Sequence, residues 1–117
     1  MAASGTLSTI RRVLGLKRRT LRTLQAELGQ SARRIGDLER QREALDNARA
    51  ELFAAGVQEW ALELLHLADA ERGWLRWQRH RHDAKQDHAR LEDALMSMRA
   101  EIRSLEIYAD RIAAETR

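Results

Sequence analysis

Residues 7–52 read LSTIRRVLGLKRRTLRTLQAELGQSARRIGDLERQREALDNARAEL. Leu or Ile recurs in this stretch at alternating steps of three and four residues, the spacing of the a and d positions along one side of a coiled-coil helix. The polar residues that interrupt the series are Lys17, Ser31 and Arg42. The stretch therefore predicts a helix with a narrow apolar seam.

A second tract continues the same rhythm to Ile112, with Arg81 and His88 as its polar interruptions. A seam this narrow must be covered by another helix of the same spacing, and the nearest such helix is the other tract. The seam residues expected to pack together are Leu7, Leu14, Leu21, Leu28, Ile35, Leu38, Trp74, Trp77, Leu91, Met98, Ile102 and Leu105.

The expected fold is all-α, a long antiparallel two-helix coiled-coil hairpin that forms a single domain over residues 1–117. We expect helices at about 6–53 and about 58–114. Each arm would be on the order of 75 Å long at the rise of an α-helix. Gly56 suits a helix C-terminus and marks the expected turn, where insertions should be tolerated best. The alternative turn is at Gly73, which ends the segment DAERG.

A fold-back at Gly56 sets the expected register of the two helices. In this register Leu7 faces Leu105, Ile10 faces Ile102 and Leu14 faces Met98. Further along, Ser31 faces Arg81, Leu38 faces Trp74 and Leu45 faces Leu67. Lys17 is the misfit opposite Leu95, and its ammonium group is expected to reach past the seam to water.

The composition excludes several classes of protein. The chain has no cysteine, which excludes disulfide scaffolds and thiolate metal sites. It also has no proline. It has neither a G-x-S-x-G motif nor a glycine-rich phosphate loop, so neither an enzyme nor a bound cofactor is expected. No apolar run is long enough for a membrane span or a signal peptide, so we expect a cytoplasmic protein without membrane insertion. Its arginine bias indicates a bacterial source.

The segment HRHDAKQDH at residues 80–88 is a candidate metal site because imidazole and carboxylate groups are common ligands. On a helix, His80, Asp83 and Asp87 share one face, but His82 and His88 point elsewhere, and the H-E-x-x-H spacing is missing. A solvated polar patch is therefore the preferred interpretation. His88 falls in the seam, where it would fix the register or lie neutral in the core.

Charge is distributed unevenly along the chain. Residues 1–34 carry eight basic side chains and one acidic one, whereas residues 35–70 carry three basic and eight acidic ones. The basic cluster surrounds its helix and has no interleaved aromatic residues, so an acidic protein partner is favoured over nucleic acid. The cluster consists of Arg11, Arg12, Lys17, Arg18, Arg19 and Arg22.

Around the expected turn, the sequence LFAAGVQEWALELLHLA at residues 52–68 is apolar on more sides than a two-helix seam can bury. Such a surplus indicates either a partner surface or local packing of the tip. The residues outside the seam are Phe53, Val57, Leu62, Leu64 and Leu65.

Three stretches together with the apolar turn resemble the YscO and FliJ family of bacterial type III secretion and flagellar export systems. They are LSTIRRVLGLKRRT, LQAELGQSARRIGDLERQREAL and ALMSMRAEIRSLEIYADRIAA. The resemblance covers nearly the whole chain and rests on its layout. It implies a central stalk that inserts into a hexameric export ATPase, links it to the export gate protein, works with export chaperones and lies peripheral to the inner-membrane secretion apparatus.

The resemblance leaves open which end of the hairpin meets which partner. The basic end suits an acidic ATPase pore and the apolar tip suits the export gate, but the reverse direction is also open. Two other functions stay open, a basic coiled-coil protein associated with nucleic acid and a self-associating helical scaffold. The same heptads serve a monomer or a four-helix homodimer.

Overall fold

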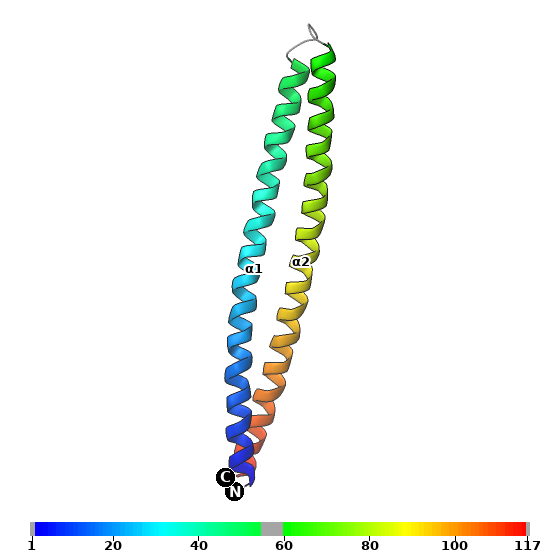
Figure 1. Cartoon of the computed structure of the whole chain (residues 1–117). Helices are drawn as coiled ribbons and strands as arrows, with labels where there is room; N and C mark the ends of the chain where they lie inside the picture. Colours follow the sequence, from blue (N-terminus) through cyan, green and yellow to red (C-terminus); the bar gives the residue numbers. More distant parts are fainter. Residues whose placement is uncertain (1, 55–59, 117) are drawn as a thin grey trace. The chain divides into compact units, whose positions relative to one another are not determined.

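The computed structural model describes the backbone of residues 2–54 and 60–116 and the side chains of residues 5–51, 54 and 68–116. Helix α1 spans Ala2–Ala54 and helix α2 spans Trp60–Glu115, and the described ranges contain no strand. The two helices run antiparallel (Figure 1). The predicted all-α helical hairpin is therefore confirmed.

Helix α1 begins earlier than predicted, at Ala2 instead of near residue 6. Gly5 and Thr6 lie inside the helix, and the Thr9 hydroxyl donates a hydrogen bond of 3.0 Å to the Gly5 carbonyl oxygen. Helix α2 begins at Trp60, two residues after its predicted start, and ends at Glu115. No helix in the described ranges contains a window long and apolar enough to cross a membrane.

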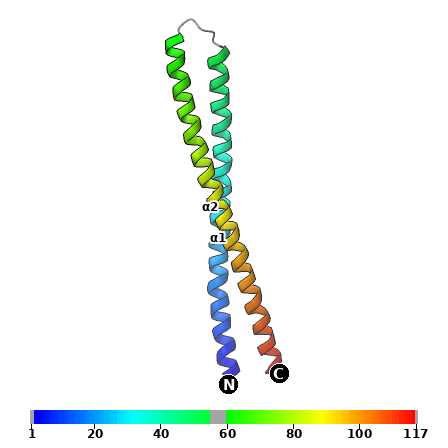
Figure 2. The same ribbon diagram turned by 90° about the vertical axis from the view of Figure 1, so that its right-hand side faces the viewer.

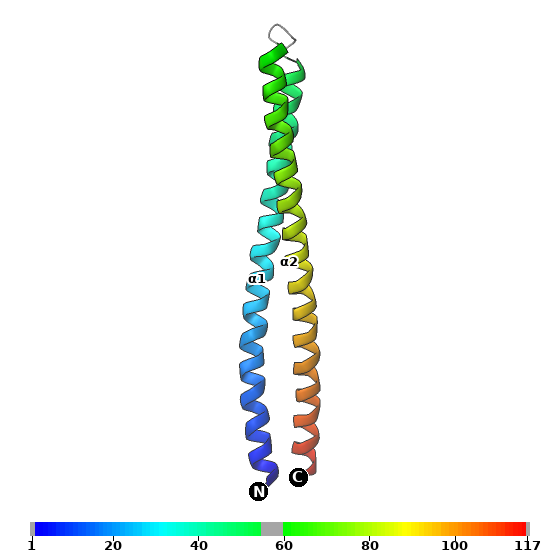
Figure 3. The same cartoon turned by 45° about the vertical axis from the view of Figure 1, so that its right-hand side comes forward.

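Contacts divide the chain into two compact units. Unit 1 comprises residues 1–29 and 89–117, and unit 2 comprises residues 30–88. Each unit contains one segment of α1 and one segment of α2, which can be followed by colour in Figures 2 and 3. Each unit therefore has its own stretch of the coiled-coil seam.

The core of unit 1 consists of aliphatic side chains from both helices. Ile10 and Leu14 of α1 pack with Ile102 and Ile112 of α2, and all four are buried. The partly buried residues that pack around them are Leu7, Leu21, Met98, Leu105 and Ala109.

The core of unit 2 contains side chains of more varied size. Leu38, Trp77 and Ala84 are its buried residues, and Ala84 is only 1% exposed. Around them pack Ile35, Leu45 and Trp74.

The predicted register is wrong by one heptad. In unit 2 the Ser31 hydroxyl lies 3.0 Å from Nδ1 of His88, whereas Arg81, its predicted partner, bonds to Glu39. In unit 1 a cavity is lined by Leu7 and Leu14 together with Ala109 and Ala113 of α2. Each of these α1 residues therefore meets a part of α2 further along the chain than predicted.

A heptad pattern cannot by itself exclude this slip, because moving one helix by seven residues places the same class of residue in every layer. The discriminating information lies in the few polar and aromatic residues. The observed register pairs Ser31 with His88 and brings Trp77 against Leu38, and both contacts satisfy polar groups inside the seam.

The alternative turn at Gly73 is also wrong. Gly73 lies inside α2, and a Cβ atom added there would be 3.6 Å from Cδ2 of Leu45, an ordinary packing distance. The helix continues through this glycine because its seam neighbours Trp74 and Trp77 anchor it to α1. Gly56, the preferred turn, lies outside the described residues.

Lys17 supplies the first testable prediction. Its side chain is 29% exposed at a seam position, and its ammonium nitrogen lies 2.7 Å from Oε2 of Glu101. An ion pair this exposed contributes little, whereas a Leu at this position buries apolar surface between the helices. Lys17→Leu is expected to raise the free energy of unfolding by about 1 kcal/mol in urea denaturation. A Leu variant less stable than the wild type would contradict this packing.

Gly15 and Gly29 supply a second prediction. Both lie within α1, and a Cβ added at either position meets nothing within 4 Å. Gly15→Ala and Gly29→Ala should each raise the free energy of unfolding by about 1 kcal/mol, because alanine favours the helix. Ala26→Gly, on the exposed side of the same helix, is the matched control and should lower it by about as much. Thermal unfolding followed by circular dichroism measures all three, and a destabilising Gly15→Ala would contradict the prediction.

Candidate functional site

The basic cluster divides between the surface and the seam. Arg11, Arg12, Arg18, Arg19 and Arg22 are exposed on α1 of unit 1, while Lys17 is half-buried and paired with Glu101. None of the five arginines has an ion-pair partner among the described residues. The first acidic residue of α1 is Glu27. The five arginines are called here the arginine surface, and they give this segment of α1 a local excess of positive charge. Arg11 and Arg18 line a cavity that Glu106 and Asp110 of α2 also line.

All of the predicted seam residues except Leu28 and Leu91 pack in the core of unit 1 or unit 2, but to different depths. Leu14, Leu38, Trp77 and Ile102 are buried. The half-buried ones are Leu7, Leu21, Leu28, Ile35, Trp74, Leu91, Met98 and Leu105. Two helices alone thus leave most seam side chains partly open to solvent.

The predicted tip residues lie outside the described side chains. Val57 lies in the undescribed connection, and the side chains of Phe53, Leu62, Leu64 and Leu65 are not described. The tip surface therefore stays a prediction from the sequence.

Unit 2 contains a cluster in which two arginines contact a stacked pair of tryptophans. The rings of Trp74 and Trp77 stack with their centroids 5.1 Å apart. The Arg42 guanidinium lies 5.6 Å from the centroid of each ring, and that of Arg81 lies 5.6 Å from Trp77. The polar interruptions of the heptad pattern at Arg42 and Arg81 thus make cation–π contacts with the seam tryptophans.

Carboxylates and a backbone carbonyl complete this cluster. Nε of Arg42 lies 3.9 Å from Oδ2 of Asp46. Nε of Arg81 donates a hydrogen bond of 3.2 Å to Oε1 of Glu39. The Trp77 indole N–H donates to the Leu38 carbonyl oxygen across the helices at 2.5 Å. These contacts support the predicted packing of both tryptophans in the seam.

The histidine-rich segment places His88 in the seam, beside Ser31. Next to it, Oδ2 of Asp87 lies 3.9 Å from Nη1 of Arg34, so one of the candidate metal ligands faces an arginine. Within the part of the chain that the structure describes, no group of three or more His, Cys, Asp or Glu side chains is placed to hold a metal ion.

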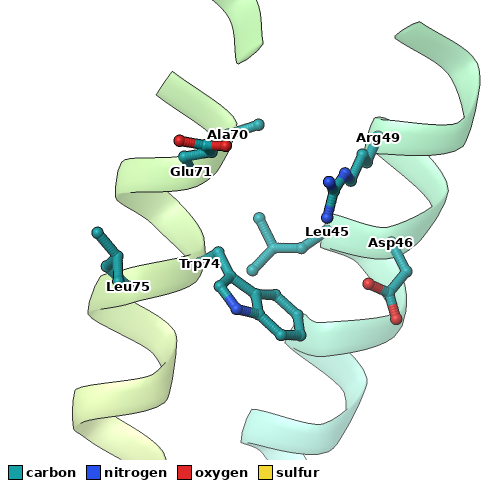
Figure 4. A pocket seen from close by; sticks show the side chains of 7 residues that line it. All are labelled: Leu45, Asp46, Arg49, Ala70, Glu71, Trp74 and Leu75. Atoms are coloured by element: carbon teal, nitrogen blue, oxygen red, sulfur yellow. The ribbon is translucent and has the colours of Figure 1, made fainter. Parts of the chain in front are cut away.

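A pocket of about 180 Å³ lies between the helices of unit 2 (Figure 4). Leu45 and Trp74 form its apolar floor, and Leu75, which is 62% exposed, lies on its α2 side. The polar residues that line it are Asp46, Arg49 and Glu71. The sequence did not predict this pocket, because several of its residues lie outside the a and d positions.

Exposed apolar side chains also occur in unit 1. They are Leu16 at 56%, Met96 at 68%, Ile107 at 51% and Tyr108 at 48% exposure. Leu16 had a detectable signal in the sequence, because it belongs to a second series at steps of three and four that includes Thr9, Val13, Thr20 and Thr23. That series is less apparent than the seam, because it consists mostly of threonine whereas the seam consists mostly of leucine and isoleucine.

Comparisons with protein-family models, with curated proteins and with solved structures found no match for this chain.

Proposed function

We propose that this protein is a non-enzymatic central stalk of a bacterial type III secretion export apparatus. In this proposal it inserts into the hexameric export ATPase and links it to the export gate protein or to export chaperones. It acts in the cytoplasm, peripheral to the inner-membrane apparatus. The proposal starts from the resemblance of the sequence to the YscO and FliJ family.

The observation that carries the proposal is the hairpin of two long helices. Helix α1 has 53 residues and α2 has 56, and in each unit they pack along an apolar seam with a few polar interruptions. A two-helix coiled coil of this kind is similar to the coiled coil of the rotary ATPase γ subunit, which turns within a ring of subunits. Its surface residues are free to contact several ring subunits.

The charge of unit 1 supports the orientation that we propose. The arginine surface belongs to the unit that contains both ends of the chain, and it would meet carboxylates inside the ATPase ring. The α1 segment of unit 2 from residue 35 onward is rich in acidic residues and suits a different partner. We therefore assign unit 1 to the ATPase and the connection between the helices to the export gate.

Stimulation of ATP hydrolysis tests the proposal. The full chain, added to the export ATPase of the same genome, should raise its hydrolysis rate and co-elute with it. A variant with Arg11, Arg12, Arg18, Arg19 and Arg22 all changed to Gln should lose both effects while keeping its helical circular dichroism. Arg76→Gln/Arg79→Gln removes exposed charges from unit 2 and is the control. Failure of the wild-type chain to bind or stimulate the ATPase would overturn the proposal.

Nucleic-acid binding is the second candidate function, because five unpaired arginines on one helix can also neutralise phosphates. Titration of a short DNA duplex at several salt concentrations separates the two. Micromolar binding with a steep loss of affinity as salt rises would favour nucleic acid. Weak binding with a shallow salt dependence would favour the stalk.

A further inference from the structure

Helix α1 carries a second stripe beside its seam. Thr9, Val13, Leu16, Thr20 and Thr23 follow one another at alternating steps of four and three residues, so they form one line along the helix. All except the half-buried Val13 are exposed, and all belong to unit 1. We call these five residues the threonine stripe.

The stripe is less polar than its composition suggests. The hydroxyls of Thr9, Thr20 and Thr23 donate to the carbonyl oxygens four residues earlier, at 3.0, 3.2 and 3.2 Å. A threonine whose hydroxyl is satisfied by its own helix turns that polar group back toward the backbone. The surface that remains is made largely of methyl groups, with Val13 and Leu16 among them.

Leu16 is the large apolar side chain of the stripe that is exposed, with 56% of its surface open to solvent. Arg12 precedes it by four residues and Arg19 follows it by three, so both lie next to it on the helix surface. Neither arginine has an ion-pair partner among the described residues. An apolar side chain bordered by two uncompensated cations has the anatomy of a small interaction site, with an apolar centre and a charged rim.

We infer that the threonine stripe is a docking site for an amphipathic helix of a partner protein, and that this helix carries carboxylates beside its apolar face. A heptad spacing on one helix is matched by a heptad spacing on another. The carboxylates would pair with Arg12 and Arg19. This inference deepens the proposed function and rests on it only for the identity of the partner.

Two other occupants fit the surface less well. A second copy of the chain, related by two-fold symmetry, would bring Arg12 and Arg19 against the same two arginines, and like charges oppose such pairing. A nucleic-acid backbone would contact the arginines but would leave Leu16 and the threonine methyl groups exposed.

Two peptides that differ only in charge test the inference. Each has about four heptads with Leu at a and d, and the e and g positions hold Glu in one and Lys in the other. Fluorescence anisotropy at low salt measures binding of each labelled peptide to the full chain. The Glu peptide should bind at least about tenfold more tightly than the Lys peptide.

Variants of the full chain locate the binding surface. Leu16→Ser and Arg12→Gln/Arg19→Gln should each weaken binding of the Glu peptide about tenfold. The matched controls are Leu75→Ser, which removes an exposed leucine from unit 2, and Arg76→Gln/Arg79→Gln. Both controls should stay within about twofold of the wild type. Circular dichroism checks that each variant is folded.

Four results would overturn the inference. The first two are equal binding of the two peptides and unchanged binding of the Glu peptide by Leu16→Ser. The third is a short DNA duplex that binds more tightly than the Glu peptide and is unaffected by Leu16→Ser. The fourth is a dimer in sedimentation that Leu16→Ser abolishes. The probe is independent of any ATPase. If the ATPase neither binds the chain nor is stimulated by it, while the Glu peptide binds at Leu16, the stalk function is contradicted. The docking site is then still supported.

Discussion

Trp77→Ala is expected to lower the free energy of unfolding by about 3–5 kcal/mol. Trp77 is 5% exposed and packs with Leu38 and Ala84 in the core of unit 2. Truncation to alanine leaves a cavity there and deprives the Leu38 carbonyl of its contact with the indole N–H. It also removes the ring that Arg42 and Arg81 approach. Urea denaturation followed by circular dichroism measures the loss.

Two further variants separate the contributions to this loss. Trp77→Phe keeps most of the ring but lacks the N–H group, so it should cost clearly less than Trp77→Ala. Trp74→Ala should also cost less, because Trp74 is only half-buried. A loss of under about 1 kcal/mol for Trp77→Ala would show that the ring is not buried between the helices.

One alanine inserted between Ala84 and Lys85 is expected to cost about 3 kcal/mol or more. Each later residue of α2 would turn by about 100° around the helix axis. Within unit 1 the side chains of Leu91, Leu95 and Ile102 would then leave the seam, although all three now lie buried or half-buried there. Thermal unfolding should show a lower midpoint and a less cooperative transition.

The control for this insertion is the same residue placed between Glu115 and Thr116. Among the described residues, Ile112 is the last one that packs in the core of unit 1, so this insertion leaves the seam in place. Its effect should stay within about 0.5 kcal/mol. Equal losses from the two insertions would contradict the assignment of the seam in α2.

Periodicity alone was enough to predict the hairpin and its seam. Burial of a narrow stripe requires a second helix, and the chain contains two tracts of matching spacing. The register could not be predicted in the same way, because all a and d layers of Leu, Ile and Met are nearly equivalent. The polar residues Ser31 and His88 break that equivalence. Their pairing becomes apparent only when the predicted and the observed registers are compared layer by layer.

The candidate interaction surfaces were predicted unevenly for a similar reason. The arginines were expected at the surface because charge is costly to bury, and five of them are exposed. Lys17 departs from the group because its d position draws its stem between the helices. The threonine stripe was missed, since threonine counts as polar until its hydroxyl is seen bonded to the backbone.

An engineered disulfide tests the central claim that the chain folds back on itself in the observed register. The natural chain has no cysteine, so Ser31→Cys/His88→Cys introduces a single pair at side chains that touch across the helices. The protein is oxidised at low concentration and digested with a protease, and mass spectrometry should find this disulfide within one chain. The Ser31→Cys/Arg81→Cys variant should stay reduced under the same conditions. Disulfides between separate chains, or an equally ready bond between positions 31 and 81, would contradict it.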